Sequence, residues 1–329
     1  MRSVPGPVGR LLVVGDVVTD IVARHRTPLA PGTDTAAAIR AVPGGAGANV
    51  ACWAAHWGCP DVRLLGRVGA DSAAWHEAAL TRAGVRPRLV VDPEEPTGTV
   101  ICLVDGGAGA ERTFLTDSGA SSRLSPDDWA PELLDGVAWL HLSGYLFFAE
   151  SSRAVAGAAM AEARARGVPV SVDPASVGFL GEFGVERFLA AVEGVAVLLP
   201  SRGEAELLAG VGAAGVAGAV PDPGADSGAD CGADSVAESA VALSRRFSEV
   251  VVTAGVDGAV VARGGEVVGR APSVGVCARD TTGAGDAFTG AFVASRILGV
   301  GVVGAVREGC RAGAVAVGRV GGRPPVPLP

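Results

Sequence analysis

Short apolar runs alternate with longer segments rich in Ala, Glu, Arg and Leu along most of the chain. Buried parallel strands are almost continuously apolar, and helix-length segments between them are typical of β-α-β units. The pattern therefore predicts a doubly wound parallel sheet with helices on both faces. The predicted strands are Leu11–Val14, Arg63–Leu65, Val137–Leu142, Val168–Val172, Val195–Leu199 and Glu249–Thr253.

Two stretches interrupt this alternation. Residues 17–42 and 97–117 follow the period-two pattern of half-buried strands, and the second reads TGTVICLVD and ERTFLTD on either side of a Gly-rich turn. We expect them to form a small antiparallel sheet, a β lid of about residues 17–43 and 97–119, beside the main sheet.

Two other segments contain few large apolar residues that a core could bury. Residues 1–10 are rich in Pro and Gly, which predicts a frayed tail before a domain at 11–329. Residues 211–238 contain the repeat GADSGADCGAD, which predicts a flexible surface insertion.

Charge and cysteine usage exclude several classes of protein. Only 19% of the 329 residues are charged and the net charge is -8, so no basic surface for nucleic acid or an anionic membrane is expected. The six cysteines show no zinc-ligand or redox spacing, which predicts reduced thiols. The apolar run at 11–14 is too short for a signal-peptide core or a membrane span. We expect a cytoplasmic protein.

The chain contains no lysine, so all 27 basic residues are arginine. A Walker P-loop and a protein-kinase fold each need a lysine on the nucleotide phosphates, and Schiff-base enzymes need an amine. Any nucleotide chemistry must therefore rely on other groups.

The stretch DTTGAGDAF at 280–288 precedes a segment with helical apolar spacing. The free backbone N–H groups of Gly283, Ala284, Gly285 and Asp286 would then converge at a helix N-terminus, where they can bind an anion. Asp286 can accept a proton from a hydroxyl that attacks a phosphoryl group. The alternative is that Asp286 only caps the helix and the glycines form a tight turn.

This sequence resembles the ribokinase or PfkB family of carbohydrate and nucleoside kinases, whose C-terminal signature is similar to DTTGAGDAFTGAF. The resemblance also covers GDVVTD at 15–20, GGAGAN at 44–49 and VVTAGVDG at 251–258, in the same order. It implies a ribokinase-like three-layer α/β/α sandwich with a small β lid, and an ATP-dependent kinase that uses Mg²⁺.

The resemblance also implies roles for individual residues. Asp286 matches the catalytic base and Gly283–Gly285 the anion hole. Asp20, Gly44, Gly45 and Asn49 match the sugar-binding positions. Thr253, Gly255 and Gly258 are similar to ATP-phosphate contacts, although an ordinary strand-to-turn junction would look the same.

The family's Asn-x-x-Glu motif, which positions Mg²⁺ through waters, resembles residues 201–204. Glu204 matches its glutamate, but Ser201 stands where asparagine is usual, and a hydroxyl cannot make the amide's pair of hydrogen bonds. Ser201 remains a candidate nucleotide contact and Glu204 a candidate Mg²⁺ group.

Some members of the family bind a monovalent cation such as potassium. The resemblance places it at Asp280 and at carbonyl groups of residues 316–321, while Pro325 stands where the ribokinase group often has serine. Members of the family also often form homodimers through the lid, and we expect the same here.

Other candidate residues have simpler interpretations. The four histidines lack metal-ligand spacing, Trp53 and Trp57 fit a helix core, and Asp173 fits a turn after a strand. Arg112 is most simply a surface side chain, although a substrate carboxylate or phosphate would be within its reach.

We therefore predict an ATP-dependent sugar kinase, with ribose as the best single candidate substrate. The alternatives are a nucleoside kinase of the adenosine or pseudouridine type, and a non-catalytic ligand-binding homologue, which Ser201 would suit. A dinucleotide oxidoreductase would need G-x-G-x-x-G after the first strand, and GDVVTD lacks those glycines.

Overall fold

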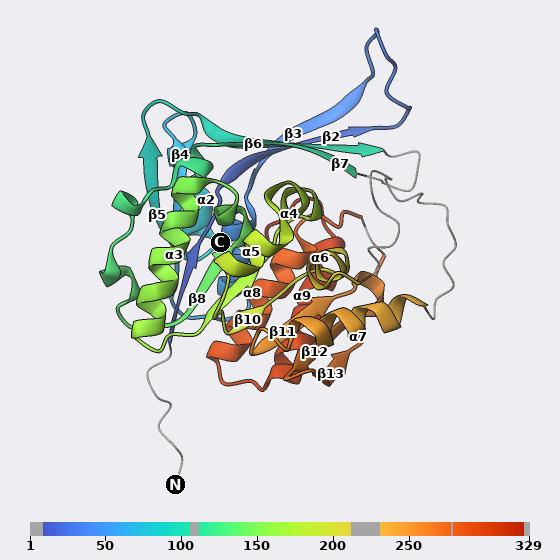
Figure 1. The fold of residues 1–329 in the computed structure, drawn as a ribbon. Helices are drawn as coiled ribbons and strands as arrows, with labels where there is room; N and C mark the ends of the chain where they lie inside the picture. Colours follow the sequence, from blue (N-terminus) through green and yellow to red (C-terminus); the bar gives the residue numbers. More distant parts are fainter. Residues whose placement is uncertain (1–8, 106–111, 212–230, 278, 326–329) are drawn as a thin grey trace.

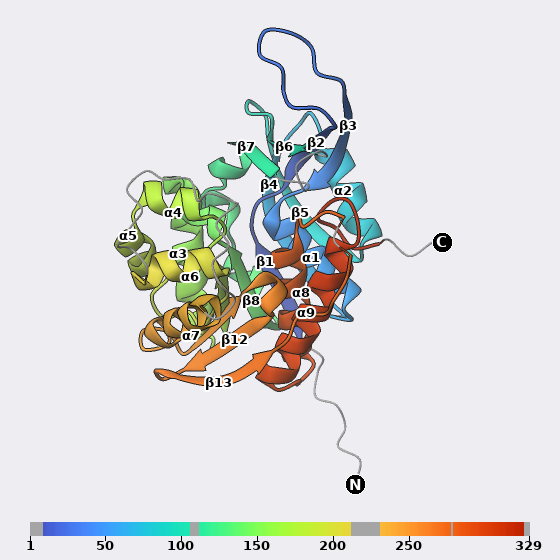
Figure 2. The same cartoon turned by 90° about the vertical axis from the view of Figure 1, so that its right-hand side faces the viewer.

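The computed structural model describes residues 9–105, 112–211, 231–277 and 279–325. A nine-stranded sheet lies between two layers of helices, and a four-stranded sheet crosses one end of it (Figures 1 and 2). The large sheet contains β1 (Arg10–Val14), β4 (Val62–Gly69), β5 (Val85–Asp92), β8 (Val137–Ser143), β9 (Val170–Asp173), β10 (Val197–Leu198), β11 (Glu249–Thr253), β12 (Ala259–Arg263) and β13 (Glu266–Ala271).

The strand order of the large sheet is β13-β12-β11-β10-β9-β8-β1-β4-β5. The strands from β11 to β5 in this order are parallel, while β12 and β13 pair antiparallel at one edge. Because parallel strands end at the same edge of a sheet, the residues that follow β1, β8, β9, β10 and β11 meet there. The predicted doubly wound sheet is confirmed.

The central strands of the large sheet are buried on both faces. An apolar core therefore lies on each face, between the sheet and the helices that cover it. Figure 2 shows one group of helices on each side. The first group is α3 (Glu150–Ala165), α4 (Val177–Phe183), α5 (Val185–Ala191), α6 (Arg202–Ala209) and α7 (Cys231–Leu243); the second is α1 (Ala46–His56), α2 (Ala73–Arg82), α8 (Ala284–Ile297) and α9 (Val302–Val317).

The smaller sheet has the order β3-β2-β6-β7, with β2 (Val18–His25), β3 (Ala37–Gly44), β6 (Thr97–Asp105) and β7 (Arg112–Gly119). β2 and β3 pair antiparallel, as do β6 and β7, and the two hairpins join through a parallel β2–β6 ladder. Successive side chains of these strands point to opposite faces of the smaller sheet, so one set faces the large sheet and the other set faces away from it.

The predicted insertion at 211–238 is partly wrong. Residues 212–230 lie outside the described residues, but the end of the predicted segment is the start of helix α7. Val236, Ala240 and Leu243 recur at helical spacing and are buried in the core, which explains why the chain is helical here despite the Gly/Ala/Asp repeat.

Of the predicted frayed tail, residues 1–8 lie outside the described residues, and Arg10 already belongs to β1. Within the described ranges, the helices are all too short or too polar to cross a membrane.

Candidate active site

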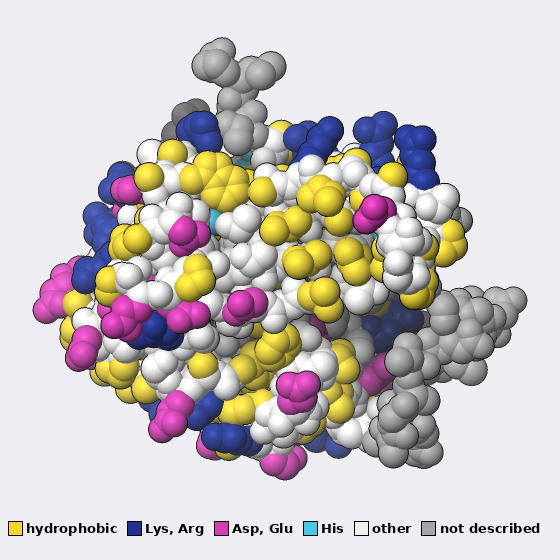
Figure 3. Space-filling model, turned by 90° about the horizontal axis from the view of Figure 1, so that it is seen from above, with side chains coloured by type: hydrophobic (Ala, Val, Ile, Leu, Met, Phe, Trp, Pro, Cys, Tyr) yellow, Lys and Arg dark blue, Asp and Glu magenta, His cyan; other side chains and the backbone are white. Residues whose placement is uncertain are grey.

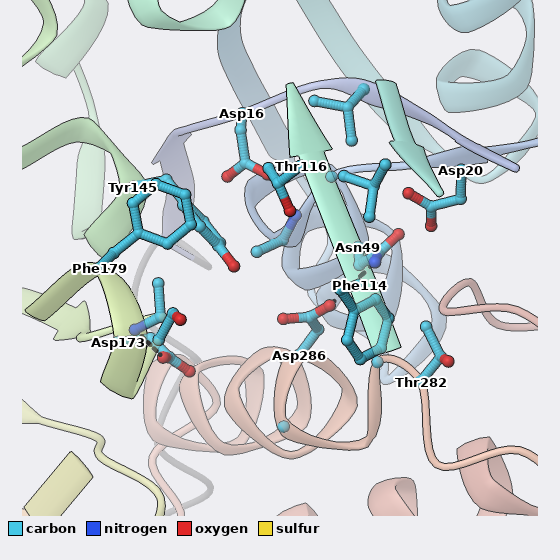
Figure 4. A pocket seen from close by; sticks show the side chains of 18 of the residues that line it. Asp16, Asp20, Asn49, Phe114, Thr116, Tyr145, Asp173, Phe179, Thr282 and Asp286 are labelled. Atoms are coloured by element: carbon cyan, nitrogen blue, oxygen red, sulfur yellow. Dashed lines mark hydrogen bonds between the residues drawn. The ribbon is translucent and has the colours of Figure 1, made fainter. Parts of the chain in front are cut away.

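A cavity of about 720 Å³ lies between the carboxyl ends of the parallel strands and the inner face of the smaller sheet. Its acidic side chains come from five different segments: Asp16, Asp20, Asp173, Glu204 and Asp286. Figure 4 shows Asp286 and Asn49 together in the middle, with Asp20 on one side and Asp173 and Tyr145 on the other. The smaller sheet covers this space with β7, which carries Phe114 and Thr116.

Helix α8 begins at the floor of the cavity, after the turn of residues 280–283. Gly283 is its N-cap and has φ of 72°, and a Cβ atom there would lie 2.5 Å from the Cα atom of Gly322. Only glycine tolerates both conditions. A Cβ atom on Gly285 would meet nothing within 4 Å. The protein's own packing therefore requires glycine at 283 but not at 285.

Asp286 lies in the first turn of α8 and faces Asn49 of α1. The Asn49 Nδ2 group donates a hydrogen bond of 2.9 Å to Asp286 Oδ2. Burial raises the pKa of Asp286 well above its ordinary value, and the charges of Asp173, Asp16 and Asp20 raise it further, against the opposing hydrogen bond from Asn49. Without a bound cation, Asp286 therefore holds a proton more strongly than an ordinary aspartate does.

Asp16 fixes the start of α1 and thereby the position of Asn49. Its carboxylate accepts hydrogen bonds from the backbone N–H groups of Ala46 (2.6 Å) and Gly47 (3.1 Å) and from the Ser143 hydroxyl (2.7 Å). An acidic side chain at a helix N-terminus is favoured by the helix dipole. Asn49 Oδ1 is buried and has no hydrogen-bond partner in the described residues.

Asp20 lies on the inner face of β2, where the backbone of Gly44 approaches it. A Cβ atom at Gly44 would lie 2.2 Å from the Asp20 carboxylate, so the glycine makes room for this side chain. Burial raises the pKa of Asp20 to about 7, with a smaller contribution from the charge of Asp16, while the nearby Arg323 lowers it. Gly45 has φ of 97° and is the N-cap of α1, directly after β3. A Cβ atom there would lie 2.5 Å from the Asp16 carbonyl oxygen.

Ser201 and Glu204 form a capping box at the start of α6. The backbone N–H of Ser201 donates to Glu204 Oε2 at 2.8 Å, and Ser201 forms a parallel bridge with Thr253, the last residue of β11. Ser201 is therefore the N-cap of α6, a position that serine suits well. Burial raises the pKa of Glu204, with hydrogen bonds from Ser201 opposing it.

Asp173, which the sequence suggested to be a turn residue, lies close enough to Glu204 for the two charges to interact. It accepts a hydrogen bond from the backbone N–H of Ala175 (3.0 Å), as a turn residue does, and one from the Thr289 hydroxyl (3.3 Å). Burial raises the pKa of Asp173 to about 7, and the charge of Glu204 contributes next. No cluster of three or more metal-ligating side chains occurs in the described part of the chain.

Most of the predicted site residues share this cavity: Asp20, Gly45, Asn49, Ser201, Glu204, Thr253, Gly283, Ala284, Gly285 and Asp286 line it. Four others do not line it. Gly44 lies beside Asp20, Asp280 begins the turn before α8, and Gly255 and Gly258 belong to the turn between β11 and β12. Sequence reasoning missed Asp16, for which the only signal is its place in GDVVTD.

An aromatic group lines the side of the cavity away from Asp20. Tyr145 follows β8 and meets the ring of Phe179 edge to face, with centroids 5.6 Å apart, while Phe148 stacks on Phe179 at 5.3 Å. Phe114 of the smaller sheet is half exposed and lines the cavity from above. Sequence reasoning did not identify these residues, because they come from three separate segments.

The model of the pfkB family of carbohydrate kinases matches residues 9–329. Bifunctional protein HldE of Azorhizobium caulinodans is 31% identical over 94% of this chain, which spans 61% of that protein's length. Fructokinase of Klebsiella pneumoniae is 28% identical over 87% of this chain and 84% of its own length.

The fold is also similar to a solved structure. The crystal structure of adenosine kinase from Sinorhizobium meliloti superposes with a TM-score of 0.79, covering 97% of this chain and 96% of that one, at 21% identity. At this identity the similarity supports the fold, a three-layer sandwich with a small additional sheet.

Proposed function

Since the chain belongs to the pfkB family of carbohydrate kinases, we propose that it transfers the γ-phosphoryl group of ATP to a hydroxyl of a small sugar, with Asp286 as the general base. Ribose is the best single candidate. The observation that carries this proposal is the hydrogen-bonded pair of Asn49 and Asp286. Both side chains line the cavity, next to the glycine-rich backbone at the N-terminus of α8.

Asp286 accepts the proton in this mechanism. The substrate oxygen forms a bond to the γ-phosphorus, the bond from that phosphorus to the leaving oxygen of ADP breaks, and the hydroxyl proton moves to Asp286. The raised pKa of Asp286 suits a base that must take up this proton. Asn49 holds the carboxylate in place through its 2.9 Å hydrogen bond.

Backbone N–H groups at the start of α8 stabilise the charge on the transferred group. The amides of residues 283–285 are the anion hole of the proposal, and the helix dipole adds to their field. Gly285 supports this role, because no other described residue lies within 4 Å of the position that a Cβ atom there would take. In a chain without lysine, such amides are a main source of positive field.

Asp20 and Asn49 bind the substrate hydroxyls. An ionised Asp20 can accept hydrogen bonds from two neighbouring hydroxyls, and the unpartnered Oδ1 of Asn49 can accept another. Gly44 and Gly45 let the backbone approach the same region. Among the described residues, Arg112 is the one arginine on the cavity wall, and it already contacts Asp280, so this wall favours an uncharged sugar over a sugar phosphate.

The nucleotide lies at the other side of Asp286 in this proposal, with its phosphates near Ser201, Thr253, Gly255 and Gly258. Glu204 and Asp173 fit the needs of Mg²⁺, because this ion usually takes one or two carboxylates together with the phosphates. When bound, Mg²⁺ neutralises phosphate charge and lowers the mutual repulsion of these carboxylates. The smaller sheet closes over the site as a lid and excludes water, which would otherwise accept the phosphoryl group.

A nucleoside substrate is the second candidate, because the aromatic group at Tyr145 and Phe179 offers an apolar surface on which a base can stack. A coupled assay of ADP formation with ribose, fructose, other pentoses and hexoses, adenosine and pseudouridine distinguishes the two. Turnover of a nucleoside but of no free sugar would reject the sugar proposal. No turnover with any of them would reject both and leave the non-catalytic alternative.

Two copies of the chain pair through the outer face of the smaller sheet in this proposal. Ile21, Ala41, Ile101 and Leu115 lie in one row across it, on the face opposite to Asp20, and Leu115 is 55% exposed. Figure 3 shows hydrophobic side chains gathered on this side of the molecule. Such a face is unusual on a monomer. Analytical ultracentrifugation should show a dimer that Leu115→Asp dissociates, and a monomeric wild type would contradict this.

A further inference from the structure

Arg112, at the start of β7, reaches from the smaller sheet to the turn that precedes α8. Its Nη2 atom lies 3.3 Å from Asp280 Oδ1, and Nη1 donates a hydrogen bond to the hydroxyl of Thr281. The two charged side chains are only 11% and 3% exposed. The sequence-based interpretation of Arg112 as a surface side chain is therefore wrong: it forms a buried ion pair between the smaller sheet and the turn before α8.

Asp280 is held from several sides at once. Its Oδ1 atom accepts a hydrogen bond from the Thr282 backbone at 2.9 Å, and Oδ2 accepts one from the Gly321 backbone at 3.0 Å. Burial opposes the charged form, but these hydrogen bonds and Arg112 outweigh it and lower the pKa of Asp280. A buried carboxylate in this state needs a cation beside it, and among the described residues Arg112 is the one at salt-bridge distance.

A potassium ion does not fit these residues. Both oxygens of Asp280 already accept hydrogen bonds, and the guanidinium of Arg112 lies 3.3 Å from Oδ1. At the end of α9, the Val317 carbonyl accepts hydrogen bonds from the N–H groups of Arg279 (2.7 Å) and Asp280 (3.1 Å). A metal ion placed here would also meet the like charge of Arg112.

We propose that Arg112 takes the place of a monovalent metal ion beside the α8 turn, and that it couples closure of the smaller sheet to the shape of the anion hole. Arg112 is a positioning residue: it touches Asp280 and Thr281, and these lie directly before Thr282 and Gly283 in the chain. Arg24 of β2 adds a second link, because its Nη2 donates to the Arg279 carbonyl at 3.3 Å. The inference rests on the proposed role of Gly283–Gly285.

The first test compares potassium with tetramethylammonium at constant ionic strength. We expect the wild-type kcat and the melting temperature of the ligand-free protein to be the same in both salts. Activation of the wild type by potassium, or its stabilisation in the ligand-free state, would overturn the proposal. The melting measurement needs no turnover, so it still decides about the ion if the protein phosphorylates none of the substrates tested and the proposed function fails.

The second test removes the guanidinium. Arg112→Ala should lower kcat by about tenfold or more, because small misplacement of catalytic groups is costly, while the KM for the sugar changes little. Added guanidinium chloride at low concentration, or potassium, should restore part of the loss. Arg40→Ala is the matched control, since Arg40 is an exposed arginine on the same sheet outside the cavity lining.

Arg112→Lys keeps a positive charge beside Asp280, so it distinguishes a loss of positioning from a loss of folding stability. It should retain the melting temperature and more activity than Arg112→Ala. An unchanged kcat in Arg112→Ala, or equal losses in Arg112→Ala and Arg40→Ala, would overturn the coupling.

Discussion

Alanine substitutions at two neighbouring glycines separate the packing of the α8 turn from its use in catalysis. Gly283 and Gly285 lie two residues apart at the start of the same helix, yet a Cβ atom would lie 2.5 Å from backbone at the first and meet nothing within 4 Å at the second. The Cα–Cβ bond in a helix tilts toward its N-terminus. A methyl group at 285 would therefore occupy part of the space in which we place the phosphoryl group.

The magnitudes follow from these contacts. Gly283→Ala should destabilise the protein by about 2–5 kcal/mol, since the left-handed conformation costs about 1–2 kcal/mol and overpacking costs about 1–3 kcal/mol. Gly285→Ala should stabilise it by up to about 0.5 kcal/mol, because alanine is the better helix former. In the same variant kcat should fall by about 10²–10³, the usual loss when anion stabilisation is disturbed.

The assay combines urea unfolding with steady-state kinetics on both variants. Gly157→Ala is the control, because Gly157 lies in the middle of α3 and a Cβ atom there also meets nothing within 4 Å. It should gain about 0.5–1 kcal/mol of stability with unchanged kcat. Full activity in Gly285→Ala would show that no reacting group approaches this backbone and would refute the anion hole.

The remaining predictions concern the carboxylates. Asp286→Asn should lower kcat by about 10² or more and leave the Kd for Mg-ATP, measured by calorimetry, nearly unchanged; a normal rate would remove Asp286 from the mechanism. Because the pKa of Asp20 is raised to about 7, kcat/KM for the sugar should fall as the pH drops through this value. Asp20→Asn should abolish that limb of the pH profile and raise KM; a limb unchanged in Asp20→Asn would assign it to another group. Between about pH 4 and pH 7, Asp20 is protonated in the native protein but ionised in the unfolded chain. Its stabilising contribution is therefore complete below about pH 4 and is lost as the pH rises through about 7. Urea unfolding at several pH values should show that stability falls less over this range in Asp20→Asn than in the wild type. Gly44→Ala, which places a methyl 2.2 Å from the Asp20 carboxylate, should raise KM for the sugar more than KM for ATP, and equal effects on both would contradict the assignment of Asp20 to the sugar.

The central strands could be predicted from the sequence because both of their faces are buried. The edge strands could not, since one or both faces meet solvent and no continuous apolar run remains. β5 reads VRPRLVVD, with arginines between its apolar residues, and β13 is largely exposed from Glu266 to Arg270. The turn of residues 280–286 was predictable because its glycines and aspartates are adjacent in the chain.

Side chains from distant segments could not be paired from the sequence. Arg112 and Asp280 are brought together only when the smaller sheet lies over α8, and the charges of Asp173 and Glu204 meet only because β9 and β10 are neighbours. Whether an arginine is exposed or buried depends on these tertiary contacts. Local sequence carries no signal for them, which is why Arg112 was first interpreted as a surface residue.

The parallel β2–β6 ladder has a consequence for how the molecule folds. It pairs Thr19 with Thr99, and the strands β4 and β5 of the large sheet lie between them in the chain. Closing such a long loop costs conformational entropy, so we expect β2 and β6 to pair readily only after β4 has paired with β1 and β5 with β4. We therefore expect the two hairpins that cover the active site to join late in folding, although each hairpin is local in the sequence.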